Sequence, residues 1–195
     1  GELPPRLDTA RSRIASFLRG DPQNLAFVRN ATEGVNAVLS SFPLQHGDEV
    51  LSTSFGYPAC LKAARRWCES RGASLVAAPL QFPVEDPGKI LAALRGAHSP
   101  RTKLLLIDHV TSGTGLVFPL EEILSWAKSR SLPTLVDRAH APGMLDLNLA
   151  DLGRLGATFY SGNFHKWCCS PKGAAFLWVS PYWSEPVHPT VVSHG

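Results

Sequence analysis

The chain has 195 residues, of which 44% are hydrophobic, enough for one domain of ordinary size with a sizeable core. Its net charge is +3, its pI is near 8.8 and its basic residues are scattered, so no surface for nucleic acid or anionic membranes is expected. Only 18% of the residues are charged, which indicates that part of the surface is covered by the chain itself or by a partner. The apolar runs are strand-sized, far short of a membrane span, and no secretory signal pattern opens the chain. These features predict a cytoplasmic protein.

The four cysteines lack the spacing of a metal site or of a disulfide framework. They are Cys60, Cys68, Cys168 and Cys169. None forms a C-x-x-C pair, and two are adjacent in sequence. We therefore expect reduced, mostly buried thiols and no metal.

Apolar periodicity and turn residues predict alternating helices and strands along the chain. The first helix is expected from a cap at Asp8 to Gly20, and one face of it would carry Leu7, Ala10, Ile14, Phe17 and Leu18. Later helices are expected to start near Thr32, Pro58, Pro87 and Pro119. Strands are predicted at residues 25–28, 49–53, 74–78, 103–108, 134–136, 157–160 and 174–179.

Seven strands, most of them separated by helices, predict an α/β fold. The expected architecture is a three-layer α-β-α sandwich around a mainly parallel seven-stranded sheet. Only the short stretch 171–173 separates the last two strands, so we expect the last strand to run antiparallel. Beyond Val179 the sequence is rich in Pro, Ser and His without a core pattern, and residues 181–195 are predicted to form an irregular tail.

Residues suited to chemistry follow the predicted strands. In a parallel sheet, ligands bind at the carboxyl ends of the strands. The residues at those ends are Asn30-Ala31-Thr32, Phe55 and Tyr57, Thr111-Ser112, Asp137 and His140, and His165 and Lys166. The sequence therefore predicts one site at this edge of the sheet.

One of these groups is suited to binding an anion, and another is suited to binding a cationic ring. Asn30-Ala31-Thr32 precedes a helix, whose N-terminal N–H groups could bind a phosphate monoester; the alternative is a simple helix cap by Thr32. A buried Asp137 needs a cationic partner, which could be a protonated pyridine nitrogen or the neighbouring Arg138. His140 could bond a cofactor's phenolic oxygen or cap a turn.

Lys166 lies among aromatic and sulfur side chains. Such surroundings lower the pKa of a lysine, as Schiff-base formation or proton transfer requires, whereas the alternative is a solvated surface lysine. Phe55 or Tyr57 could stack on a flat ring or could only pack. Asn163 and His165, which flank the lysine, could reach a phosphate.

Together these motifs resemble the class V aminotransferase family of fold-type-I pyridoxal-phosphate enzymes, which includes the cysteine desulfurases. The stretches that carry the resemblance are Asn30-Ala31-Thr32, Asp137-x-Ala139-His140, Ser161-Gly162-Asn163-x-His165-Lys166-Trp167 and Pro171-Lys172-Gly173. The sequences of these motifs are most similar to those of the isopenicillin N epimerase-like branch. The resemblance runs from about Leu7 to Val179.

The resemblance implies a role for each site residue. Lys166 would form a Schiff base with pyridoxal phosphate and shuttle the substrate α-proton, Asp137 would pair with the pyridine nitrogen, and His140 would lie near the ring oxygen. The phosphate would be held by Ala31, Thr32, Asn163 and His165. Phe55 or Tyr57 would cover the ring, with Ser112 nearby. The substrate would be an amino acid and the protein a homodimer.

Two departures from the family accompany the resemblance. Arg138 replaces a residue that is commonly small, and family members are considerably longer. We therefore expect residues 1–180 to form an incomplete cofactor-binding large domain, with 181–195 beginning a missing C-terminal region.

The predicted function is epimerisation or a related step at the α-carbon. The alternatives are a carbon–sulfur lyase or desulfurase, and a truncated domain without catalysis. A Rossmann enzyme is disfavoured, because Asn-Ala-Thr-Glu-Gly replaces the Gly-x-Gly-x-x-Gly turn.

Overall fold

The computed structural model describes residues 3–192 and contains a seven-stranded sheet. Its strands are β1 (Leu25–Val28), β2 (Glu49–Thr53), β3 (Ser74–Ala78), β4 (Thr102–Asp108), β5 (Thr134–Arg138), β6 (Phe159–Asn163) and β7 (Ala175–Val179). Their order across the sheet is β1-β7-β6-β5-β4-β2-β3. The pairs from β6 to β3 are parallel, whereas β7 is antiparallel to both β6 and β1. The predicted topology, including the antiparallel last strand, is confirmed.

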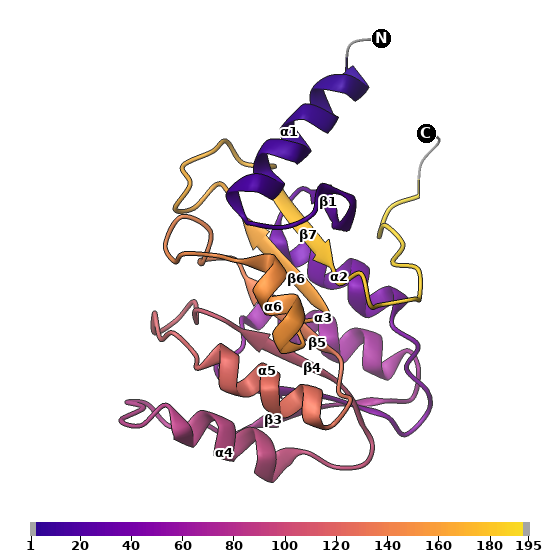
Figure 1. Cartoon of the computed structure of the whole chain (residues 1–195). Helices are drawn as coiled ribbons and strands as arrows, with labels where there is room; N and C mark the ends of the chain where they lie inside the picture. Colours follow the sequence, from indigo (N-terminus) through magenta and orange to yellow (C-terminus); the bar gives the residue numbers. More distant parts are fainter. Residues whose placement is uncertain (1–2, 193–195) are drawn as a thin grey trace.

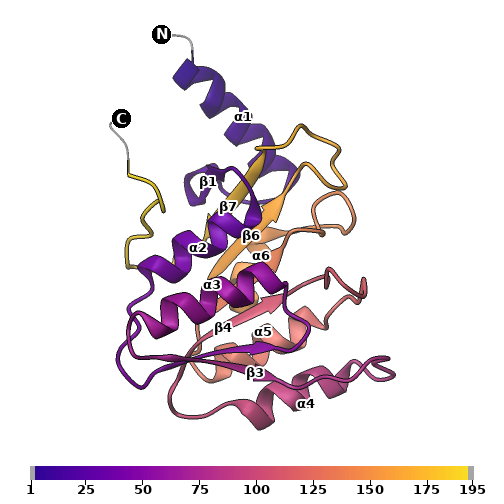
Figure 2. The same ribbon diagram turned by 180° about the vertical axis from the view of Figure 1, so that it is seen from behind.

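Helices cover both faces of this sheet. One face carries α2 (Ala31–Ser41) and α3 (Pro58–Glu69), as Figure 2 shows. The other face carries α4 (Gly88–Ala97), α5 (Leu120–Ser129) and α6 (Leu149–Leu155), which lie in front of the sheet in Figure 1. The expected three-layer sandwich is therefore confirmed.

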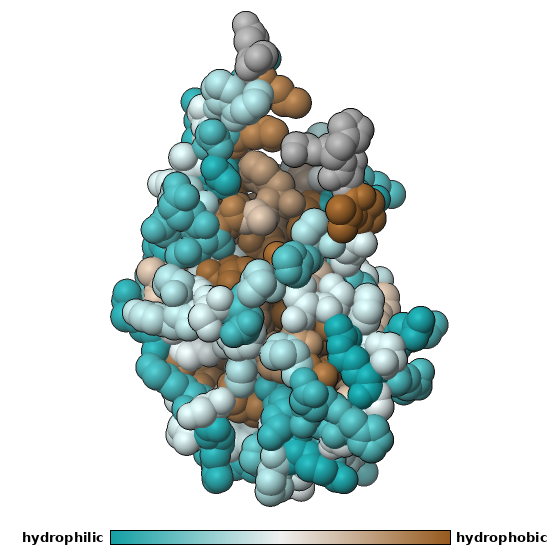
Figure 3. Space-filling model, turned by 90° about the vertical axis from the view of Figure 1, so that its right-hand side faces the viewer, coloured by the Kyte–Doolittle hydropathy of each residue, from teal (hydrophilic) through white to brown (hydrophobic). Residues whose placement is uncertain are grey.

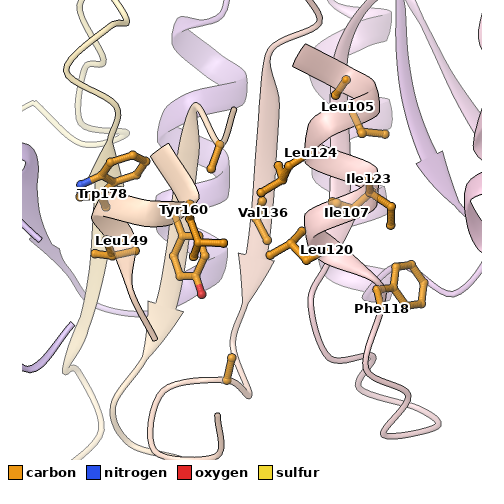
Figure 4. Packing of buried hydrophobic residues seen from close by; sticks show 14 of the residues in the cluster. Leu105, Ile107, Phe118, Leu120, Ile123, Leu124, Val136, Leu149, Tyr160 and Trp178 are labelled. Carbon is orange, nitrogen blue, oxygen red and sulfur yellow. The ribbon is translucent and has the colours of Figure 1, made fainter. Parts of the chain in front are cut away.

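Each interface between sheet and helices has its own apolar core. Beneath α5 and α6 the core contains side chains from both the strands and the helices, among them Leu105, Ile123, Val136, Leu149 and Tyr160 (Figure 4). Beneath α2 and α3 it contains Val35, Val38 and Leu39 of α2. Burial on both faces explains why the central strands read as continuous apolar runs.

The N-terminal helix differs from the prediction. Helix α1 (Leu3–Phe17) begins before Asp8, so Asp8 is not its cap. Leu7 and Phe17 are exposed, and Ala15 is the buried residue of this helix. Figure 1 shows α1 projecting from the body. Of the predicted apolar face, Leu18 is buried in the core beneath α5 and α6 and Ile14 packs against that core. The face shown in Figure 3 has its apolar surface concentrated at the same end of the molecule.

Two short elements and two strand ends were not predicted. The 3-10 helix η1 (Pro22–Asn24) and α6 are too short to give a clear period, although Asn148 caps α6 by accepting from Asp151 N–H. Strands β5 and β6 extend to Arg138 and Asn163, beyond the apolar runs that predict them. Several site residues therefore belong to strands and not to loops.

The segment after β7 forms no helix or strand in residues 181–192, and 193–195 of the predicted tail lie outside the described residues. Trp183 nevertheless packs on the body, with its ring stacked on Phe42 at a centroid distance of 5.5 Å. His188 N–H donates to Ser41 Oγ at 2.9 Å. Between residues 3 and 192, no helix has both the length and the apolar character to cross a membrane.

Candidate active site

The predicted residues from three neighbouring strands meet at the carboxyl edge of the sheet. In the β4–β5 register Asp108 lies opposite Asp137, and in the β5–β6 register Asp137 lies opposite Ser161. A small cavity opens at this edge and is lined by Tyr57, Asp108, Val110, Ser112, Asp137, Ala139, His140 and Lys166. Lys166 thus faces two carboxylates and an imidazole.

Lys166 is half-buried, and its Nζ lies 2.9 Å from Nε2 of His140. Burial lowers the pKa of Lys166, an effect that the charges of Asp137 and Asp108 oppose. Burial also lowers the pKa of His140, and the nearby Lys166 lowers it further. The solvated surface lysine considered from the sequence is therefore wrong. The Lys166–His140 contact is suited to proton exchange at Nζ.

Asp137 is held by two donors at the end of β5. The Cys60 thiol donates to Oδ2 at 3.0 Å, and Ala139 N–H donates to Oδ1 at 3.0 Å. Burial raises the pKa of Asp137, while these two hydrogen bonds and Lys166 oppose the increase. No arginine bonds this carboxylate among the described residues, and so a cationic ring nitrogen would complete its coordination.

Arg138 lies on the opposite face of the sheet, because successive side chains of a strand alternate. Its Nη2 lies 3.2 Å from Nε2 of His109, and its guanidinium carbon lies 4.4 Å from the Tyr160 ring centroid. The ion pair between Asp137 and Arg138 considered from the sequence is therefore wrong. Arg138 is buried, and its Nε and Nη1 have no hydrogen-bond partner among the described residues. This burial lowers the pKa of its guanidinium.

The N-terminus of α2 lies beside the end of β6. Asn30 caps α2 by accepting from Glu33 N–H at 2.9 Å, so a cap by Thr32 is wrong. Ala31 N–H donates to Asn163 Oδ1 at 2.8 Å, and the Ser161 hydroxyl donates to the Ala31 carbonyl at 3.0 Å. These bonds fix a helix N-terminus, with its partial positive charge, at the same edge of the sheet as Lys166.

The remaining predicted residues differ in position. Tyr57 and Ser112 line the cavity, whereas Phe55 packs against the core beneath α5. Of the two aromatic residues, Tyr57 is thus the one placed to cover a ring. His165 is half-buried, and its Nδ1 has no hydrogen-bond partner among the described residues, so it retains a free bonding site.

The sequence reasoning missed Asp108 and Cys60. Asp108 is 4% exposed, and its Oδ1 accepts from Tyr57 N–H at 3.4 Å. Burial and the neighbouring Asp137 raise its pKa to about 8. The signal was available, because Asp108 ends an apolar strand as Asp137 does. Cys60 gave no such signal, since only the packing of α3 brings it to Asp137.

The thiols divide into two groups. Cys60 and Cys68 are buried, Cys168 is half-buried and Cys169 is exposed, so the expectation of mostly buried thiols holds for two of them. All four are free. Burial, followed by the charge of Asp137, raises the pKa of Cys60 far above its ordinary value, and the thiol stays protonated.

Comparisons with known proteins agree with this geometry. A family model described as Aminotransferase class-V matches residues 2–194. Isopenicillin N epimerase of Streptomyces clavuligerus is 40% identical over 197 residues, which cover 98% of this chain and 48% of the relative. Putative L-cysteine desulfhydrase 1 of Oryza sativa subsp. japonica is 32% identical over 210 residues, with coverages of 98% and 43%.

Solved structures give the same picture. A complex of the cystine C–S lyase C-DES with its reaction product cysteine persulfide has a TM-score of 0.83 and 26% identity, covering 90% of this chain and 46% of that chain. A mutant of C-DES with glycine covalently linked to its pyridoxal-phosphate cofactor matches with the same values. The chain spans about half the length of the relatives it matches.

Proposed function

Because the chain belongs to the aminotransferase class-V family, we propose that it forms the cofactor-binding part of a pyridoxal-phosphate enzyme that acts at the α-carbon of an amino acid. We assign it to epimerisation or a related step, which the identity to isopenicillin N epimerase supports. The observation that carries this proposal is the meeting of Lys166, His140 and Asp137 around one cavity.

The residues present fit this cofactor in three ways. Asp137 is a buried carboxylate with two neutral donors and, in the described part of the chain, no arginine partner, which suits a protonated pyridine nitrogen. The N-terminus of α2 and the free Nδ1 of His165 suit a phosphate. Lys166 is half-buried, with its pKa lowered toward the range of a reactive amine.

Each of these side chains then has a defined task. When bound, pyridoxal phosphate supplies the electron sink that makes the α-proton of an amino acid removable. Asp137 keeps the ring nitrogen protonated. Lys166 would hold the cofactor through its Nζ and would move the α-proton at that atom, and His140 Nε2 would orient Nζ through their contact of 2.9 Å. Thr32, His165 and the Nδ2 group of Asn163 would hold the phosphate, at a helix N-terminus that the hydrogen bond between Ala31 N–H and Asn163 Oδ1 fixes in place, and Tyr57 would cover the ring.

A carbon–sulfur lyase is the second candidate. The desulfhydrase relative and the likeness to C-DES support it. A desulfurase that uses a protein thiol would need a reactive cysteine, and Cys60 is not suited to that role, since it donates to Asp137 and stays protonated. Incubation with cysteine separates the candidates, because a lyase releases sulfide whereas an epimerase only inverts the α-carbon. The homodimer and the cytoplasmic location expected from the sequence stay predictions.

The cofactor assignment is tested by absorbance. Protein mixed with pyridoxal phosphate should gain a band near the edge of the visible range that Lys166→Ala loses. Lys172→Ala is the matched control, since Lys172 is exposed and lies only six positions further along the chain. A protein that stays colourless with added cofactor, or a Lys166→Ala variant with an unchanged band, contradicts the proposal.

A further inference from the structure

Asp108 and Asp137 form a pair of buried carboxyl groups, of which the proposed function gives a role to Asp137 alone. They lie opposite each other in the register of adjacent parallel strands, so their side chains project from the same face. They are 4% and 3% exposed, and both line the cavity that Lys166 enters. Two carboxylates this close in a buried site cannot both ionise without a large cost in free energy.

The charged and titratable groups around the pair are few. Cys60 reaches it from α3, whereas His140 and Lys166 reach it from the segments after β5 and β6, and the Tyr57 backbone reaches it from the start of α3. Of the residues between 3 and 192, Lys166 is the one full cation that lines this cavity. One cation can balance one carboxylate, and a second ionised carboxylate would be left without a partner.

The hydrogen bonds decide where the negative charge lies. Asp137 accepts two bonds of 3.0 Å, from the Cys60 thiol and Ala139 N–H. Asp108 accepts a single long bond of 3.4 Å, from Tyr57 N–H. Because donors stabilise a carboxylate over a carboxylic acid, the charge belongs on Asp137.

We propose that Asp108 and Asp137 share one proton, with the charge on Asp137 and the proton on Asp108, so that Asp108 is a neutral hydrogen-bond donor in the cavity. This inference rests on the proposed function for the role of Asp137 toward the ring nitrogen. It deepens that function in one respect. A neutral Asp108 leaves one carboxylate in the cavity for one cationic ring.

The shared proton has a signature that needs no cofactor. An aspartate whose folded pKa exceeds its unfolded value of about 3.9 takes up a proton on folding, so stability falls as the pH rises above that value. One proton taken up changes the unfolding equilibrium constant about tenfold per pH unit. Urea unfolding between about pH 5 and pH 7 measures this slope. The lowered pKa of His140 gives a slope of opposite sign. Asp137 is one of the charges that act on His140 and Asp108 is not, so the His140 contribution cancels when Asp108→Asn is compared with the wild type, and that comparison carries the test.

The variants isolate the pair. Asp108→Asn mimics the neutral acid and should lose most of the proton uptake, Asp137→Asn should lose a similar amount, and the double variant should lose little more. Asp146→Asn, which removes an exposed carboxylate bonded to Arg19, should keep the wild-type slope. An Asp108→Asn slope equal to that of the wild type overturns the proposal. If Asp108→Asn fails to fold, Asp108→Ser takes its place under the same criterion.

Absorbance with pyridoxal phosphate separates this inference from the proposed function. We expect Asp108→Asn to keep the cofactor band, with affinity within about threefold of the wild type, and Asp137→Asn to lose most of it. If Asp108→Asn loses the band as fully as Asp137→Asn does, the assignment of the proton to Asp108 is wrong. A wild-type protein that binds no cofactor contradicts the proposed function, and the unfolding slopes still decide the shared proton.

Discussion

Gly34 allows α2 to lie directly on β6, and its replacement by alanine should destabilise the protein. A Cβ at Gly34 would lie 2.2 Å from Ser161 Oγ and 3.0 Å from Ser161 Cβ, both far inside normal contact distances. Ser161 cannot rotate freely, because its hydroxyl contacts the Ala31 carbonyl at 3.0 Å and the Phe176 carbonyl at 3.1 Å. Either α2 moves away from the sheet or both contacts break.

The expected magnitude follows from opposing contributions. Replacing glycine by alanine inside a helix gains about 0.5–1 kcal/mol. Overpacking costs about 1–3 kcal/mol, and losing the one hydrogen bond that the Ser161 hydroxyl can donate costs about 1 kcal/mol. We therefore expect Gly34→Ala to lower the free energy of unfolding by about 1–3 kcal/mol. For a chain of this size each kcal/mol lowers Tm by about 2–4 °C.

The control for this substitution is a glycine in a free position of another helix. Gly96 lies exposed in α4, and a Cβ there has no neighbour within 4 Å. Gly96→Ala should therefore raise the free energy of unfolding by about 0.5–1 kcal/mol. Urea unfolding and thermal melting of both variants measure the difference in sign. Adding Ser161→Gly should recover part of the loss in Gly34→Ala, because it removes both atoms that clash. A Gly34→Ala protein as stable as the wild type would refute the close packing of α2 on β6.

Two further predictions concern buried polar groups. Arg138→Met removes a buried cation whose partners, within the part of the chain that the structure describes, are His109 and the Tyr160 ring, so we expect the free energy of unfolding to rise by about 1–4 kcal/mol. Arg138→Lys, which keeps the charge, should not show this gain in urea unfolding. A loss of stability in Arg138→Met would contradict the burial of Arg138 without a carboxylate partner among the described residues. Asn163→Ala leaves the buried Ala31 N–H without its acceptor and should lower the free energy of unfolding by about 1–3 kcal/mol in the same assay. It should also weaken pyridoxal-phosphate binding in an absorbance titration. Stability equal to that of the wild type would contradict the Asn163–Ala31 hydrogen bond.

The sequence predicted the sheet and grouped several of the residues that line the cavity, because both depend on local pattern. Apolar runs located all seven strands, and the rule that ligands bind at carboxyl ends grouped Asp137, His140 and Lys166 correctly around one cavity. What it could not supply depends on distant packing. Only the strand register sets Asp108 opposite Asp137, and only the docking of α3 brings Cys60 to that carboxylate.

Successive side chains of β5 point to opposite faces of the sheet, so this strand contributes to both the core and the site. Asp137 and Arg138 are neighbours in sequence, yet the sheet separates them, with the carboxylate in the cavity and the guanidinium in the core. A slip of one residue would exchange their faces. It would bury a carboxylate against the Tyr160 ring and bring a second cation to Lys166, where the two would repel each other. The same register also pairs Val136 with Tyr160 and so closes the core beneath α5. Packing and charge therefore select the same register for β5. The register that buries the apolar side chains of this core also places Asp137 beside Lys166.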